Sequence, residues 1–187
     1  MRLLFFAGSA REGSHNKKLA QLGQQIAAAN GIEAVFADLA DYHMPIYHGD
    51  LEDDQGVPDR ALAFKALLEA YDGVLIVTPE YNASIPPLLK NTLDWVSRVK
   101  SAEDVYKTRV FAISGASPGY YGAMRSLLTL RQILEVGLGA TVIPQQMALP
   151  RASQAFEADG SLKDENQQKM FASVIEALAV AARKFAS

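Results

Sequence analysis

The sequence contains no cysteine. Disulfide bonds, thiol catalysis and thiolate metal sites are therefore excluded, and any redox chemistry would need a bound cofactor. Histidine is scarce as well, since only His15, His43 and His48 occur. Their positions lack the paired spacing on a helix that is typical of zinc sites, and no thiolate could complete such a site. We therefore expect no bound metal.

The sequence also lacks an excess of positive charge and a long hydrophobic run. It carries 18 Lys and Arg against 21 Asp and Glu. Nucleic acids and anionic membranes select basic surfaces, so we expect neither as a partner and favour small-molecule chemistry. The longest apolar helical stretches, residues 127–138 and 174–182, contain charged residues and are too short to span a bilayer. The apolar run at residues 3–7 is too short for a signal peptide, so we expect a cytoplasmic location.

Enough apolar material is present for one well-buried core. The chain has 187 residues, of which 49% are hydrophobic, and we expect residues 1–187 to form a single domain. Short continuous apolar runs predict strands buried on both faces, as in a parallel sheet. A weaker alternating run predicts a further strand at residues 33–36. The continuous runs are residues 3–7, 74–77, 110–113 and 141–143.

Helical patterns separate these strands. They begin after turn or proline signals such as Pro58 and Pro86-Pro87, and the first ends at Asn30-Gly31. Regular alternation predicts an α/β fold, a three-layer doubly wound parallel sheet of five strands with the flavodoxin-like order 2-1-3-4-5. A ligand then belongs at the carboxyl ends of the strands. We expect residues 40–57 to form a long irregular connection.

The loop after the first strand has the composition of a phosphate site. It reads Gly8-Ser9-Ala10-Arg11-Glu12-Gly13-Ser14-His15-Asn16 and leads into a helix. Hydroxyl donors, free backbone amides, the helix N-terminus and one arginine together suit an anion. The loop lacks the P-loop and dinucleotide patterns, so a terminal monophosphate fits best. The alternative is that Ser14 or Asn16 only caps the helix and that Arg11 is a solvated charge.

A second loop follows the third strand and reads Thr78-Pro79-Glu80-Tyr81-Asn82-Ala83-Ser84-Ile85-Pro86-Pro87. Its prolines make it rigid, and an aromatic side chain beside an amide can form a wall against a planar ring. Alternatively, Tyr81 packs on the surface and Asn82 is a turn residue. The helix beyond this loop carries Trp95 at core spacing, so we expect Trp95 in the core.

A third loop follows the fourth strand and reads Ser114-Gly115-Ala116-Ser117-Pro118-Gly119-Tyr120-Tyr121-Gly122. Its small residues predict another wall of the same pocket. The alternative is a helix-entry loop in which Ser117 is a turn residue. A serine hydrolase is disfavoured, because no Gly-x-Ser-x-Gly elbow follows any strand.

These three loops, together with Leu89-Lys90-Asn91 and Asp94-Trp95, resemble the NADPH-dependent FMN reductase family, which includes quinone, chromate and azo-dye reductases. The resemblance spans about residues 1–145, and the Pro-Glu-Tyr-Asn block is its most specific part. Where many members carry a Gly-Gly pair before the fourth helix, this chain has Tyr121-Gly122-Ala123.

The resemblance implies bound FMN. Its phosphate would lie on Ser9, Arg11, Ser14, His15 and Asn16, its ring against Pro79, Glu80, Tyr81 and Asn82, with Ser117 and Gly119 closing the other side. NADPH or NADH would donate a hydride to the flavin, which then reduces a quinone, free flavin or a related acceptor in ping-pong order, with no side chain acting as catalyst.

The resemblance also implies a homodimer or homotetramer. The fourth helical pattern supports self-association, because its apolar band is wider than packing on one sheet face requires. One alternative is a flavodoxin-type electron carrier, although a net charge of −3 is modest for electrostatic steering. Another is an FMN-binding module without turnover of its own.

Overall fold

The computed structural model describes residues 1–101 and 103–185. Its five strands form one all-parallel sheet with the order β2-β1-β3-β4-β5, which confirms the predicted flavodoxin-like topology. The weak run at residues 33–36 is a full member of this sheet. The strands are β1 (Arg2–Ala7), β2 (Glu33–Asp38), β3 (Gly73–Thr78), β4 (Val110–Ala116) and β5 (Thr141–Leu149).

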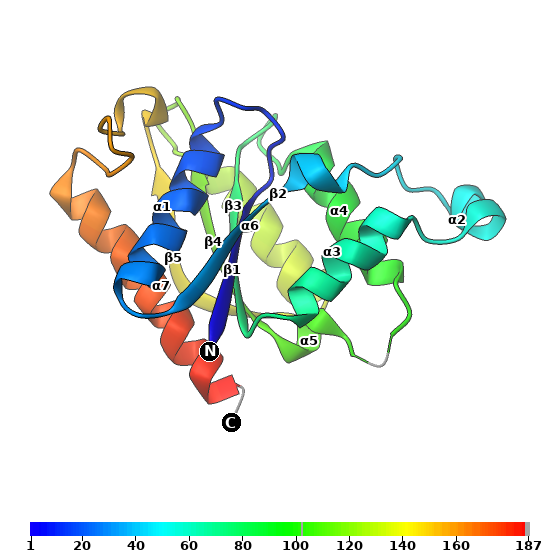
Figure 1. Ribbon diagram of the computed structural model, residues 1–187. Coiled ribbons are helices and arrows are strands. Elements are labelled where there is room, and N and C mark those ends of the chain that lie inside the picture. Colours follow the sequence, from blue (N-terminus) through cyan, green and yellow to red (C-terminus); the bar gives the residue numbers. More distant parts are fainter. Residues whose placement is uncertain (102, 186–187) are drawn as a thin grey trace.

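Helices cover both faces of the sheet, which gives the three predicted layers (Figure 1). One face carries α1 (His15–Ala29) and α7 (Glu165–Phe185). The other carries α3 (Asp59–Glu69), α4 (Pro87–Arg98), the short α5 (Val105–Thr108) and α6 (Met124–Gln132), which continues as the π-helix η2 (Ile133–Gly137). Pro58 and Pro86 occupy the N-cap positions of α3 and α4, as the proline signals predicted.

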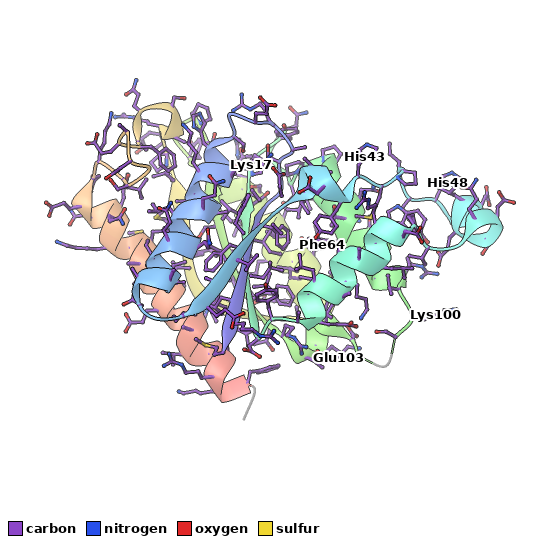
Figure 2. All side chains as sticks on the ribbon, in the orientation of Figure 1. Lys17, His43, His48, Phe64, Lys100 and Glu103 are labelled. Carbon is purple, nitrogen blue, oxygen red and sulfur yellow. The ribbon has the colours of Figure 1, made fainter. Side chains whose placement is uncertain are left out.

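Alternate side chains of each central strand supply the two halves of the core. Phe5 of β1 packs in the half under α1 and α7, and its neighbour Phe6 packs in the half under α3, α4 and α6. Phe64 of α3 meets Phe6 edge-on, with ring centroids 5.2 Å apart, and points at the sheet (Figure 2). Burial on both faces explains why these strands are continuous apolar runs.

The run predicted at residues 141–143 is buried on both faces at Val142 and Ile143, whose side chains lie in opposite halves of the core, but β5 extends beyond this run. Several of its nine residues are exposed, because β5 lies at the edge of the sheet. Its register with β4 shifts between Phe111, which pairs with Val142, and Ile113, which pairs with Gln146. Pro144 lies within this irregular stretch and has no N–H for the ladder.

Residues 39–57 form an arm that extends from the body of the protein (Figure 1). The expectation of an irregular connection is only partly right, since the arm contains the 3-10 helix η1 (Leu39–Tyr42) and the short helix α2 (Gly49–Gln55). Trp95 of α4 binds the arm to this helix. Its side chain is fully buried, and its Nε1 donates a hydrogen bond of 2.7 Å to the carbonyl oxygen of Pro45, which confirms the core expectation.

No helix within residues 1–101 and 103–185 is long and apolar enough to cross a membrane.

Candidate functional site

The loops after β1, β3 and β4 meet around one cavity of about 250 Å³ at the carboxyl edge of the sheet. β1 lies between β2 and β3, so the strand order reverses there, and this is the position at which doubly wound folds bind ligands. The residues that line the cavity are Ser9, Arg11, Ser14, His15, Asn16, Pro79, Glu80, Tyr81, Ala116, Ser117 and Pro118.

The loop after β1 is arranged around the start of α1. Ser14 is the N-cap residue, and its Oγ accepts hydrogen bonds from the backbone N–H groups of Asn16 (3.2 Å) and Lys17 (3.4 Å). Ser14 therefore caps the helix and lines the cavity as well. The guanidinium of Arg11 donates to the carbonyl oxygen of Gly13 at 3.2 Å and has no carboxylate partner among the described residues. Its positive charge is available to an anion.

Asn16 uses its side chain to join two of the loops. Its amide makes two hydrogen bonds to the backbone of Ala116 at the end of β4, and Asn16 is only 4% exposed. The side chain is therefore committed to holding the loop after β1 against the end of β4. Its contribution to a phosphate site would be positional.

Lys17 of α1 stabilises the same loop by linking it to the end of β2. Its buried Nζ lies 2.5 Å from Oδ2 of Asp38 at the end of β2 and donates a hydrogen bond of 3.1 Å to the carbonyl oxygen of Ala10. Sequence reasoning missed this pair. A signal was present, because a lysine in the first turn of a helix opposes the helix dipole and so needs a reason to be there.

His15 lines the cavity and has a buried polar atom without a partner among the described residues. Its Nδ1 is shielded from solvent and has no hydrogen-bond partner within the described structure. Burial, together with the charges of Arg11 and Lys18, lowers the pKa of His15 below its usual value, so the imidazole is held neutral. Its ring lies nearly parallel to that of Phe156, at 8° with centroids 6.4 Å apart. A buried polar atom without a partner costs about 1–3 kcal/mol, which a ligand could recover.

The loop after β3 supplies the second wall. Backbone hydrogen bonds between Tyr81 and Ser84, at 2.9 and 3.0 Å, close a tight turn. The two central residues, Asn82 and Ala83, have φ values of 50° and 65°. Both residues are exposed, and Asn82 does not line the cavity. Asn82 thus occupies the turn position that the sequence left open as its alternative.

Glu80 ties this wall to α6. Its nearly buried carboxylate forms an ion pair with Arg125 and also accepts the backbone N–H of Arg125 at 3.1 Å. The guanidinium of Arg125 lies over the ring of Tyr121, 5.4 Å from the centroid. Sequence reasoning included Glu80 but missed Arg125.

The loop after β4 forms the third wall. Ser117 lines the cavity, and its Oγ accepts the backbone N–H of Gly119 at 3.2 Å. Gly119 itself does not line the cavity, and its carbonyl oxygen accepts the N–H of Arg151. Farther along the loop, Gly122 and Ala123 have φ values of 56° and 72°. They occupy the place of the expected Gly-Gly pair, and Ala123 adopts the left-handed conformation despite its side chain.

Nine of the eleven expected site residues therefore line one cavity, and Asn82 and Gly119 do not. His43 and His48 lie on the arm, apart from Lys17 of α1 (Figure 2). Across residues 1–101 and 103–185, no three His, Asp or Glu side chains are grouped so that they could hold a metal ion.

Known proteins are similar to this chain in sequence and fold. The profile of the NADPH-dependent FMN reductase family matches residues 1–154, most of the chain. The chain belongs to the NADPH-dependent FMN reductase family. An NAD(P)H-dependent FMN reductase of Pseudomonas aeruginosa is 30% identical over 184 residues, which cover 98% of this chain and 96% of that protein. A quinone reductase of Escherichia coli K12 is 35% identical over 134 residues, 72% of this chain and 69% of that one.

A solved structure agrees with this family assignment. The flavoenzyme FerB of Paracoccus denitrificans, described as an NAD(P)H:(acceptor) oxidoreductase, superposes with a TM-score of 0.83 at 30% identity and 98% coverage of both chains. The resemblance to the FMN reductase family and the oxidoreductase class predicted from the sequence are both confirmed.

Proposed function

We propose that residues 1–187 form one FMN-binding domain whose cavity holds the flavin. The phosphate would lie at the loop after β1 and the ring against Pro79, Glu80 and Tyr81. The main support for this proposal is that the three loops bring unpaired polar groups to one cavity, at the point where the strand order of the sheet reverses. The unpaired charge of Arg11, the orphaned Nδ1 of His15 and the N-terminus of α1 all suit a phosphate.

The reaction follows from what FMN would supply when bound, namely acceptance of a hydride from NADPH or NADH and donation of two electrons to a quinone, free flavin or related acceptor. The protein's contribution is to bind and orient. Arg11 and the α1 N-terminus would fix the phosphate end, while the Glu80–Arg125 pair would hold the second wall in place. Both substrates would use the same opening in turn, so we propose ping-pong kinetics. The quinone reductase relative from E. coli supports a quinone as acceptor.

We further propose a homodimer, and pairing of dimers into a tetramer, with α4 and α6 in the interface. On α6 and η2, Leu127, Leu130 and Leu134 are fully buried against the sheet. Leu128 and Val136 on the same segment are 61% and 82% exposed. Large apolar groups left on one helix beyond its packed face favour association with another chain.

A second candidate is an electron carrier that meets protein partners and has no turnover with NADPH. Such carriers are steered by strong charge, and a net charge of −3 gives this candidate little support.

The test of the proposed function begins with apoprotein that is titrated with FMN and followed by flavin fluorescence. The loaded protein is then mixed anaerobically with NADPH or NADH, and afterwards with benzoquinone.

We expect saturable FMN binding, rapid bleaching of the visible flavin absorbance on reduction, and recovery of the colour on addition of quinone. Binding without bleaching by either nucleotide would favour the carrier. Failure to bind FMN would overturn the proposal itself. Parallel initial-rate lines with varied NADPH and quinone would support ping-pong order, and intersecting lines would contradict it.

A further inference from the structure

A second cavity, of about 310 Å³, lies beside the first at the carboxyl edge. The two cavities flank the same short loop. Ser117 and Pro118 line the first, and Tyr120 lines the second. Two residues of extended chain span at most about 7 Å, so the cavities are close neighbours. Arg151 and Lys163, which follow β5, also line the second cavity.

Backbone hydrogen bonds fix the geometry between the two cavities. Beyond the sheet, Arg151 donates its N–H to the carbonyl oxygen of Gly119 at 3.2 Å, and Ala152 donates to that of Ser117 at 3.0 Å. Arg151 also has a φ of 51°, a left-handed conformation that costs a residue with a side chain about 1–3 kcal/mol and is concentrated at binding sites. The position of Arg151 is therefore set by the surrounding structure.

The second cavity carries unpaired positive charge. Neither Arg151 nor Lys163 has a carboxylate partner in the part of the chain that the structure describes. One acidic group, Asp164, also lines the cavity, but its Oδ1 accepts the N–H groups of Asn166 (2.8 Å) and Gln167 (3.1 Å) and so serves the start of α7. An arginine with a nearby lysine suits a phosphate monoester.

The same cavity offers a surface for a planar base. The ring of Tyr120 is 76% exposed, although it stands at the rim of a cavity. The amide side chains of Gln154 and Gln167 are close by and can donate and accept hydrogen bonds. An aromatic face, two amides and two cations together match a ligand that combines a purine with a phosphate.

We propose that the second cavity binds the adenosine 2′-phosphate end of NADPH while the nicotinamide reaches the first cavity. This inference rests on the proposed function, because it assigns the hydride donor of that site. The second cavity would distinguish NADPH from NADH, since only NADPH carries the 2′-phosphate that Arg151 and Lys163 would bind. NADPH is therefore the preferred donor of this chain.

The first experiment measures binding without turnover. Adenosine 2′,5′-bisphosphate, adenosine 5′-monophosphate and inorganic phosphate are each titrated into FMN-loaded protein by calorimetry. Arg151→Ala and Lys163→Ala are compared with Arg60→Ala, a matched loss of an exposed arginine on α3. A charge-assisted hydrogen bond corresponds to about ten- to a hundredfold in affinity. We expect the bisphosphate to bind tightest and each cavity variant, but not Arg60→Ala, to weaken it by about that factor.

Two results of this experiment would overturn the inference. One is a bisphosphate no tighter than adenosine 5′-monophosphate or inorganic phosphate. The other is an effect of Arg151→Ala no larger than that of Arg60→Ala. Because this binding experiment needs no hydride transfer, its result is valid even if the flavin is not reduced.

The second experiment compares kcat/KM for NADPH and NADH in the same variants. We expect Arg151→Ala to lower the value for NADPH about tenfold or more and to leave that for NADH unchanged. Equal losses for both nucleotides, or none, would overturn the inference while leaving the reductase function intact. Absence of bleaching by both nucleotides in the unmodified protein would count against the proposed function instead.

Discussion

The side-chain amide of Asn16 is bound through both of its polar atoms to the backbone of Ala116, one hundred positions away in the sequence. Oδ1 accepts the N–H of Ala116 at 2.9 Å, and Nδ2 donates to its carbonyl oxygen at 3.0 Å. This pairing joins the first turn of α1 to the end of β4. It therefore fixes the distance between two walls of the cavity that the three loops form.

Asn16→Ala should destabilise the apoprotein strongly. The substitution leaves the N–H and carbonyl groups of Ala116 buried without partners, at about 1–3 kcal/mol for each group. We expect the free energy of unfolding, measured by urea denaturation, to fall by about 2–4 kcal/mol. Gln21→Ala, which removes an exposed amide from the same helix, is the control and should change little. Equal effects of the two substitutions would contradict the role of Asn16.

Arg11→Ala should weaken FMN binding about ten- to a hundredfold, the value of a hydrogen bond to a charged group. Riboflavin has the same ring and ribityl chain without the phosphate, so its weaker binding should change little. Both affinities can be measured by quenching of flavin fluorescence. Equal losses for the two ligands, or no loss for either, would show that the loop after β1 does not bind the phosphate.

The stability of the apoprotein should depend on pH through His15. Its folded-state pKa is lowered, so the unfolded chain binds the proton more tightly. The stabilisation from neutral His15 is fully present above the usual histidine pKa of about 6.5 and is lost as the pH falls below that value. Urea unfolding at pH 7.5 and 5.5 should show a smaller acid loss for His15→Gln than for the unmodified protein. An identical loss would contradict this linkage.

Ala83→Gly should stabilise the protein. Residues 81–84 form a tight turn with two successive left-handed residues, a geometry that favours Asn followed by Gly. Relief of left-handed strain at exposed Ala83 outweighs the added freedom of the unfolded chain, for a net gain of about 0.5–1 kcal/mol. Ala158→Gly, at an exposed loop position without a positive φ, should instead destabilise. Thermal unfolding of both variants tests this difference, and a matching loss for Ala83→Gly would refute it.

Self-association should depend on the exposed apolar groups of α6 and η2. Light scattering at micromolar concentration should give at least twice the chain mass of 20.3 kDa, and Leu128→Glu should lower it. Leu62→Glu on α3, where the leucine is 45% exposed, is the control and should leave the mass unchanged. A monomer mass for the unmodified protein would exclude the proposed dimer.

Much of the fold could be predicted because its signals are local. A strand such as β3 must bury both of its faces, which requires a continuous apolar run, and Pro86 and Pro87 mark the start of the next helix. The register of β5 could not be predicted in this way. The predicted strand order already placed β5 at the edge, but the shift of its register with β4 between Phe111 and Ile113 depends on contacts between distant segments.

The cavity at the carboxyl edge was likewise predictable in part. The sequence by itself determined that three loops of suitable composition follow β1, β3 and β4, because residue type and order are enough to place them at one edge. Only the tertiary structure decided what each side chain does there. Lys17 pairs with Asp38 and Glu80 pairs with Arg125, and in each pair the two residues are too far apart in the sequence for a local pattern to predict the contact. From its residue type, Asn82 suited both a turn position and a ligand contact. The backbone hydrogen bonds between Tyr81 and Ser84 place it in the turn.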